Sequence, residues 1–112
     1  MGDAEALSAL ADWLGALAHP DRLRLVLELA DAECDVATLS GAAGLPQPRT
    51  SQHLALLRAH GIVASRREGR RVCYRLADPA VVSWVGRAAQ FVADDADRRS
   101  DLGPLLERFR SG

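Results

Sequence analysis

The spacing of apolar residues changes at Gly61, and this change limits the folds open to the chain. Before Gly61, apolar residues recur every three or four positions, as in amphipathic helices. Across residues 71–76 the period is two, with the larger apolar side chains expected inward and Cys73 outward between two arginines. Glu68-Gly69 supplies a turn, so we expect a β-hairpin over residues 62–77.

Helical spacing predicts four helices before this hairpin and one long helix after it. The expected helices span residues 3–18, 20–31, 36–43 and 47–60, and a fifth begins at Asp78-Pro79. The third and fourth helices are joined by a short turn after Gly44, which is typical of a helix-turn-helix. We expect the fourth helix to bury Ala55 and Leu56.

Length and composition favour one globular domain over residues 1–112. Of its residues, 48% are hydrophobic and 26% are charged, so a disordered chain is excluded. The expected fold is mainly α with a β-hairpin, a winged helix-turn-helix with four helices, two strands and a last helix. Its expected parts are a helix-turn-helix over 35–60, a wing over 62–77, dimerisation helices over 1–18 and 79–101, and a tail over 102–112.

Large apolar residues on the terminal helices predict a homodimer. Trp13, Trp84 and Phe91 exceed what a small domain needs for its own core, and paired helices would bury them. The alternative is that these side chains complete the core of a monomer.

Sequence signals of compartment point to the cytoplasm. The apolar stretches are too short to cross a bilayer, and no export signal follows Met1. Two distant cysteines, Cys34 and Cys73, form no disulfide framework, so a reducing compartment is expected.

Positive charge is concentrated in the middle third of the chain. Residues 45–77 hold seven arginines against one acid, Glu68, whereas the whole chain has a net charge of −1. A nucleic-acid backbone is the natural partner of such a segment, although a solvated basic face would have the same composition.

The basic segment has the kinds of side chain that bind double-stranded DNA. Short polar and basic side chains at a helix start suit the phosphate backbone, while Gln and Arg reach base edges in the major groove. The arginine-rich hairpin offers a second contact to phosphates or the minor groove. We expect base contacts from Gln47, Thr50, Ser51, Gln52 and His53, and backbone contacts from Arg49 and the wing arginines Arg66, Arg67, Arg70, Arg71 and Arg75. Arg58, on the fourth helix, is also expected to bind DNA.

The same segments resemble the arsenic-repressor (ArsR/SmtB) family over about residues 10–93. The resemblance lies in Leu17-Ala-His-Pro-Asp-Arg-Leu-Arg, in Ser51-Gln-His-Leu and in Glu68-Gly-Arg-Arg with Tyr74-Arg-Leu. It implies a winged-helix dimer that binds a promoter inverted repeat, usually as a repressor released by an effector. The effector and the operator sequence are left open.

Metal sensing through the sites typical of that family is not expected. The resemblance aligns Asp35 and Ala37 with the family's two cysteine ligands, and Cys34 lies one residue earlier. The last helix has no histidine, and its acids, Asp94, Asp95, Asp97 and Asp101, suit a solvated surface. We therefore predict no metal ligands and no cofactor, although a site of other ligands stays open.

The cysteines are candidates for a redox response. Cys73 lies between Arg71 and Arg75, where oxidation would add negative charge beside DNA. Cys34 lies at a helix start, but its acidic neighbours oppose a thiolate. Either cysteine could instead be an inert small apolar residue.

Two other classes of function are disfavoured by the same residues. No nucleophile, base and orienting group occur at an interpretable spacing, and no glycine-rich phosphate loop is present, so no enzyme is predicted. A winged helix used only for protein contacts would need an apolar or acidic recognition helix, unlike residues 47–52.

Overall fold

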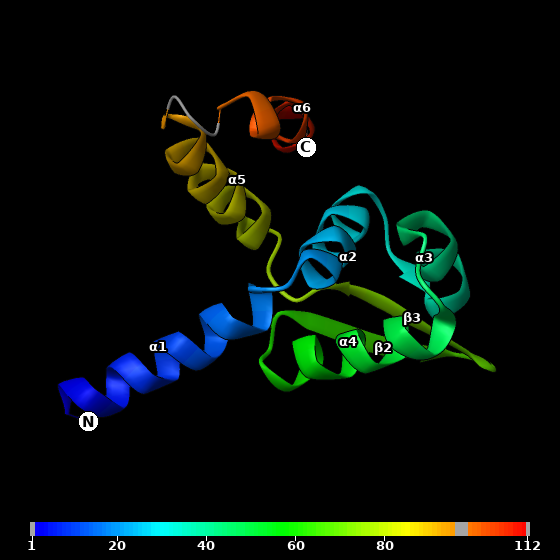
Figure 1. Ribbon diagram of the computed structural model, residues 1–112. Coiled ribbons are helices and arrows are strands. Elements are labelled where there is room, and N and C mark those ends of the chain that lie inside the picture. The colour runs from blue at the N-terminus through cyan, green and yellow to red at the C-terminus, as the bar shows by residue number, and fades with distance from the viewer. Residues whose placement is uncertain (1, 96–98, 112) are drawn as a thin grey trace. The chain divides into compact units, whose positions relative to one another are not determined.

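The computed structural model describes residues 2–95 and 99–111, which form two compact units divided between Ala77 and Asp78. The first unit contains helices α1 to α4 and a small sheet, and the second contains helices α5 and α6 (Figure 1). Each unit is described by itself.

Helices α1 (Asp3–Leu17) and α2 (Pro20–Asp31) meet at a sharp break after Leu17. Pro20 begins α2, and the His19 side chain caps it by accepting the Asp21 backbone N–H at Nδ1. Four apolar residues of α2 are buried: Leu25, Val26, Leu27 and Leu29. By contrast, α1 buries only Ala16 and Leu17, and leaves Leu7 and Leu10 exposed.

Helices α3 (Val36–Ala43) and α4 (Gln47–Ala59) confirm the predicted helix-turn-helix. Asp35 caps α3 by accepting the Thr38 backbone N–H, and Gly44 ends it with φ of 70°, which glycine adopts without strain. The predicted inner face of α4 is wrong by one residue, because Leu54 and Leu57 are buried while Ala55 and Leu56 are exposed.

The wing is an antiparallel hairpin, as predicted, formed by β2 (Val63–Glu68) and β3 (Arg71–Leu76). Glu68 pairs with Arg71, so Gly69-Arg70 forms the turn, one residue later than the predicted Glu68-Gly69. Gly69 has φ of 63°, as the first position of a tight hairpin turn requires.

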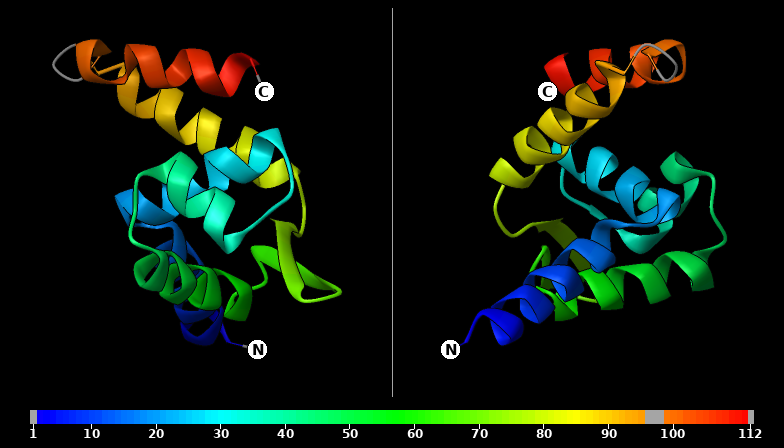
Figure 2. Two further views of the ribbon diagram at one scale, coloured as in Figure 1. Left: turned by 90° about the vertical axis from the view of Figure 1, so that its right-hand side faces the viewer. Right: turned by 60° about the vertical axis from the view of Figure 1, so that its left-hand side comes forward.

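A third strand, β1 (Cys34–Asp35), was not predicted. It pairs with β3, Asp35 opposite Cys73, and gives the order β1-β3-β2. Two residues are too few for any periodicity to reveal, and only the tertiary fold brings them to β3. The hairpin projects from this unit in the left view of Figure 2.

The second unit consists of α5 (Ala80–Ala93) and α6 (Arg99–Ser111). Helix α5 is shorter than the range 79–101 predicted for a dimerisation helix; of that range, residues 96–98 lie outside the described residues. Helix α6 is longer than the one or two helical turns expected in the tail. Phe109 packs over Gly86, where a Cβ would lie 3.1 Å from the Phe109 Cβ.

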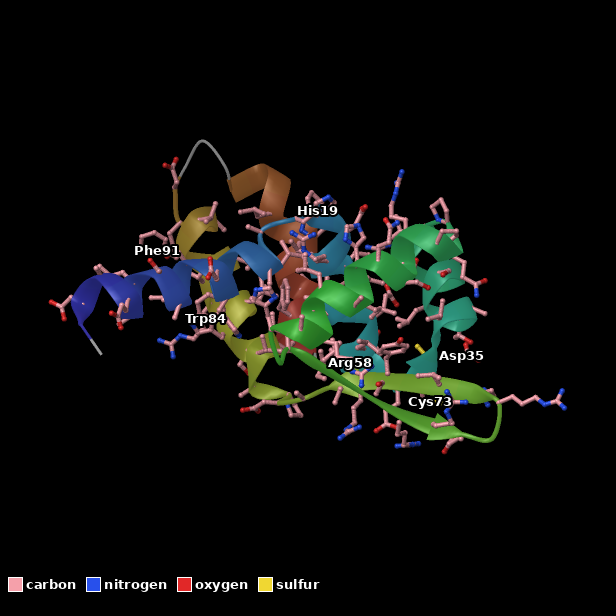
Figure 3. All side chains as sticks on the ribbon, turned by 90° about the horizontal axis from the view of Figure 1, so that it is seen from below. His19, Asp35, Arg58, Cys73, Trp84 and Phe91 are labelled. Atoms are coloured by element: carbon pink, nitrogen blue, oxygen red, sulfur yellow. The ribbon has the colours of Figure 1, made fainter. Side chains whose placement is uncertain are left out.

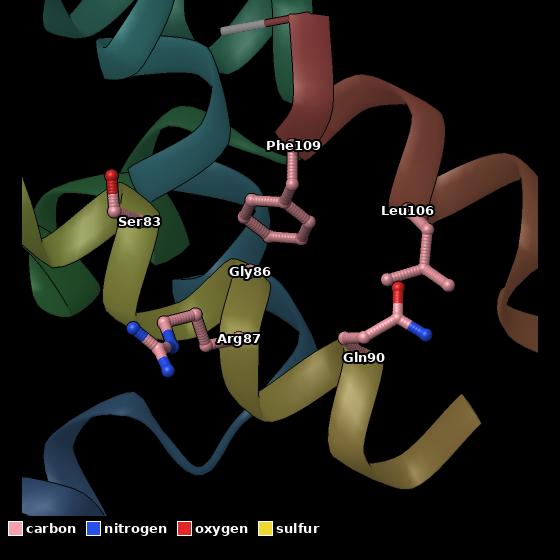
Figure 4. A pocket seen from close by; sticks show the side chains of 6 residues that line it. All are labelled: Ser83, Gly86, Arg87, Gln90, Leu106 and Phe109. Atoms are coloured by element: carbon pink, nitrogen blue, oxygen red, sulfur yellow. The ribbon is translucent and has the colours of Figure 1, made fainter. Parts of the chain in front are cut away.

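A hollow at this helix pair is shown in Figure 4. It is lined by Ser83, Gly86, Arg87, Gln90, Leu106 and Phe109. Among the described residues, no helix is long and apolar enough to cross a membrane.

Candidate nucleic-acid interface

The start of α4 presents a row of exposed polar side chains. Gln47, Arg49, Ser51 and Gln52 are all exposed, and they lie in the first two turns of the helix. The N–H groups at a helix start attract anions, and no side chain caps this one. The surface therefore combines an anion-binding helix end with amide side chains suited to base edges.

Thr50 differs from the expectation, because its side chain is fully buried. Its hydroxyl donates to the Pro46 carbonyl at 3.1 Å, in the first turn of α4. A buried hydroxyl cannot reach a base, so the predicted DNA contact of Thr50 is wrong. Its neighbours Arg49 and Ser51 are exposed because they point to other sides of the helix.

His53 is also turned inward, with only 14% of its side chain exposed. Its Nε2 lies 3.4 Å from Asp21 Oδ2, and its Nδ1 lies 3.3 Å from Arg22 Nη1. These contacts bind α4 to the start of α2, so His53 is held within the first unit. Its predicted contact with a base would require these interactions to change.

The wing follows α4 in the chain, and its strand β2 contacts that helix (Figure 1). Arg70 lies in the exposed turn at the tip of the hairpin. Among the residues that the structure describes, Arg67, Arg70 and Arg75 are exposed and have no salt bridge. Arg58, in the last turn of α4, is exposed too. All four arginines can bind phosphates without first breaking a salt bridge to a carboxylate.

Two wing arginines are instead held by acids. Arg66 lies 2.6 Å from Glu33 and 3.1 Å from Glu68, and Arg71 lies 3.1 Å from Asp35. The hydrogen bond from Arg66 lowers the pKa of Glu68. Hydrogen bonds from Thr38, followed by the charge of Arg71, lower the pKa of Asp35. These pairs fasten the hairpin to the connection between α2 and α3.

The structure overturns the expected environment of Cys73. Its side chain is buried rather than outward, and its thiol donates to Glu68 Oε2 at 3.5 Å. Burial, followed by this hydrogen bond, raises the pKa of Cys73. Cys34 is partly buried, and burial followed by the charge of Asp35 raises its pKa also. Both environments favour the thiol, which opposes the predicted redox role of either residue.

One cluster of metal-ligating side chains was missed by the sequence analysis. His19, Asp21 and His53 each place one ligand atom within 4.8 Å of the others. His19 precedes α2 and His53 lies within α4, so the two histidines are far apart in sequence and no spacing motif could have revealed the cluster.

Comparison with known proteins agrees with this geometry. The model of the bacterial regulatory protein, arsR family, matches residues 19–65. The chain is 42% identical to the HTH-type transcriptional repressor SmtB of Mycobacterium tuberculosis over 92 residues, 82% of this chain and 68% of that protein. It is 40% identical to the HTH-type transcriptional regulator CmtR of Mycobacterium bovis over 106 residues, 94% of this chain and 86% of that protein.

A solved structure of similar fold is the homodimeric winged helix-turn-helix DNA-binding domain from Mycobacterium bovis, determined in solution. It superposes with a TM-score of 0.72 at 33% identity, over 88% of this chain and 93% of that one.

Proposed function

Because the chain belongs to the ArsR family of bacterial regulatory proteins, we propose that it is a DNA-binding transcriptional repressor. It acts in the cytoplasm as a homodimer on an inverted repeat in a promoter. The family consists of transcriptional regulators, not enzymes.

The observation that carries this proposal is the exposed row on α4 beside a wing with unpaired arginines. Gln47, Ser51 and Gln52 face solvent from the start of a helix that fits the major groove. Arg70, at the hairpin tip, extends the positive surface so that it can reach the DNA phosphate backbone beside the major groove. A surface with both features binds duplex DNA, whereas a docking site for a protein helix would be apolar.

A two-fold dimer explains the exposed apolar residues of the terminal helices. Leu7, Leu10, Trp84 and Phe91 are 65%, 53%, 45% and 82% exposed. Exposed apolar groups of this size typically mark an interface. A two-fold axis would set two recognition helices about 34 Å apart, one turn of DNA.

The test is fluorescence anisotropy with DNA from upstream of the protein's own gene. We expect saturable binding that weakens steeply with salt, because phosphate contacts release counterions. Gln52→Ala should change the ranking of single base-pair variants of the site. Arg70→Ala should weaken binding to all of them alike and lower the salt slope by about one.

Arg66→Ala is the matched control for Arg70→Ala, because Arg66 is already paired with Glu33 and Glu68. It should change the salt slope less than Arg70→Ala. Absence of binding, both to the upstream DNA and to a random duplex library, would contradict the proposal.

A further inference from the structure

We propose that His19, Asp21 and His53 form a zinc site that joins the start of α2 to the recognition helix α4. One ligand atom from each residue lies within 4.8 Å of the other two. Asp21 Oδ2 and His53 Nε2 are already 3.4 Å apart, and the two imidazole rings lie 4.7 Å apart between centroids. Figure 3 shows where His19 lies.

The donor set suits a transition metal rather than calcium or magnesium. Two imidazole nitrogens and one carboxylate oxygen are typical ligands of Zn²⁺, which accepts three protein ligands and a water. Bonds of about 2.0–2.2 Å require ligand atoms about 3.3–3.6 Å apart in a tetrahedral site. His19 would therefore move inward by about an ångström, which a side-chain rotation can supply.

Both rings now use their acceptor nitrogen in a hydrogen bond. His19 Nδ1 accepts the Asp21 backbone N–H at 3.0 Å, and Arg22 Nη1 lies 3.3 Å from His53 Nδ1. A guanidinium can only donate, so Nδ1 of His53 is the acceptor and Nε2 carries the proton toward Asp21.

Zinc therefore competes with these hydrogen bonds. A neutral imidazole has a single acceptor nitrogen, and a metal takes it. Binding of zinc by both rings must therefore break two hydrogen bonds, the one from the Asp21 backbone N–H to His19 and the one from Arg22 to His53. Arg22 also donates from Nε to the Ala16 carbonyl and from Nη2 to the Gly15 carbonyl, at 2.6 and 3.2 Å. The ion thus loosens the link between the end of α1 and α4.

The site lies next to the DNA-reading surface, since His53 follows Gln52 directly on α4. It differs from the two family sites tested on the sequence, which lie on the third and last helices. Metal binding is measured without DNA, so its outcome does not depend on the proposed repressor function.

The experiment is a titration of the untagged, reduced, metal-free protein with Zn²⁺ by calorimetry. We expect one equivalent to bind. His19→Gln, Asp21→Asn and His53→Gln should each weaken binding by at least about tenfold. His60→Gln is the matched control, because its Nδ1 contacts the Leu56 carbonyl away from the cluster. It should bind as the unmodified protein does, and so should Cys34→Ser/Cys73→Ser.

Arg22→Gln tests the competition directly. It retains all three ligands and removes the competing cation, so we expect it to bind zinc more tightly than the unmodified protein. Weaker binding by this variant in its folded state would contradict the competition.

A measurement on the unmodified protein covers the case in which a variant fails to fold. Zinc should shift the ring ¹⁵N resonances of His19 and His53 and speed hydrogen exchange at the Asp21 amide, with His60 unchanged. The proposal is overturned if zinc does not bind, if the three ligand variants bind as tightly as the unmodified protein, or if only the cysteine variant loses binding.

Discussion

Thr50 and Gln52 show how two polar residues on one helix acquire different roles. Both occur in the segment that resembles DNA-reading helices, and both were expected to contact bases. Gln52 is exposed, whereas Thr50 lies beneath the helix with its hydroxyl on the Pro46 carbonyl. The position on the helix surface, not the residue type, therefore decides which of the two side chains is free to contact DNA and which supports the helix.

Thr50→Val should destabilise the protein without changing which DNA it prefers. The two side chains have nearly the same shape, so the loss of one buried hydrogen bond should cost about 1 kcal/mol. Urea unfolding followed by circular dichroism measures this change. Ser51→Ala, at the exposed neighbouring position, should change the free energy of unfolding by less than about 0.5 kcal/mol. Equal stability of Thr50→Val and the unmodified protein would mean that this hydrogen bond contributes nothing.

At the scale of elements, Asp35 connects helix α3 to the wing. Its side chain accepts the Thr38 N–H as the cap of α3 and also pairs with Arg71 on β3. Its backbone forms half of β1, which pairs with that strand. Helix α3, strand β1 and the hairpin therefore meet at one residue, and the pKa of its carboxyl is lowered chiefly by the Thr38 hydrogen bonds.

This lowered pKa makes the contribution of Asp35 depend on pH. A carboxyl with a lower pKa in the folded state stabilises above its unfolded pKa, about 3.9. That stabilisation is lost as pH falls through the lower folded value. Asp35→Asn keeps a good helix cap but removes the charge. It should be less stable than the unmodified protein at pH 6, with the difference shrinking below about pH 4.

Unfolding free energies measured between pH 3 and pH 6 would check this dependence, from about one pH unit below the ordinary carboxyl pKa to about two units above it. Asp12→Asn, on the exposed side of α1, is the control. A difference between Asp35→Asn and the unmodified protein that stays constant across this range would show that the charge is not the cause.

At the scale of the whole molecule, the terminal helices carry more apolar surface than their own units bury. Phe91 is 82% exposed on α5, and Leu7 and Leu10 are more than half exposed on α1. The similar domain from Mycobacterium bovis is homodimeric. A second copy of the chain is the partner that would remove this surface from water.

Phe91→Glu should therefore shift the protein from dimer toward monomer. Loss of an aromatic side chain from the interface should reduce the free energy of dimerisation by about 1.5–3 kcal/mol. A two-fold interface contains this residue from both copies, so the loss occurs twice. The dimer Kd should rise by more than about tenfold. Sedimentation velocity over a range of concentrations measures the shift, with Leu56→Glu on α4 as the control. An unchanged dimer would exclude Phe91 from the interface.

Local pattern was sufficient for the helix order, the hairpin and the basic segment, because period, caps and turn residues act over a few positions. Gln47, Arg49, Ser51 and Gln52 are exposed, as a contact with DNA requires, and their contact with DNA stays a prediction. Strand β1, the burial of Cys73 and Thr50, the acids that hold Arg66 and Arg71, and the cluster of His19 with His53 were decided only by tertiary structure. Each of these features depends on which distant segments pack together, and the periodicity of the sequence does not predict that packing.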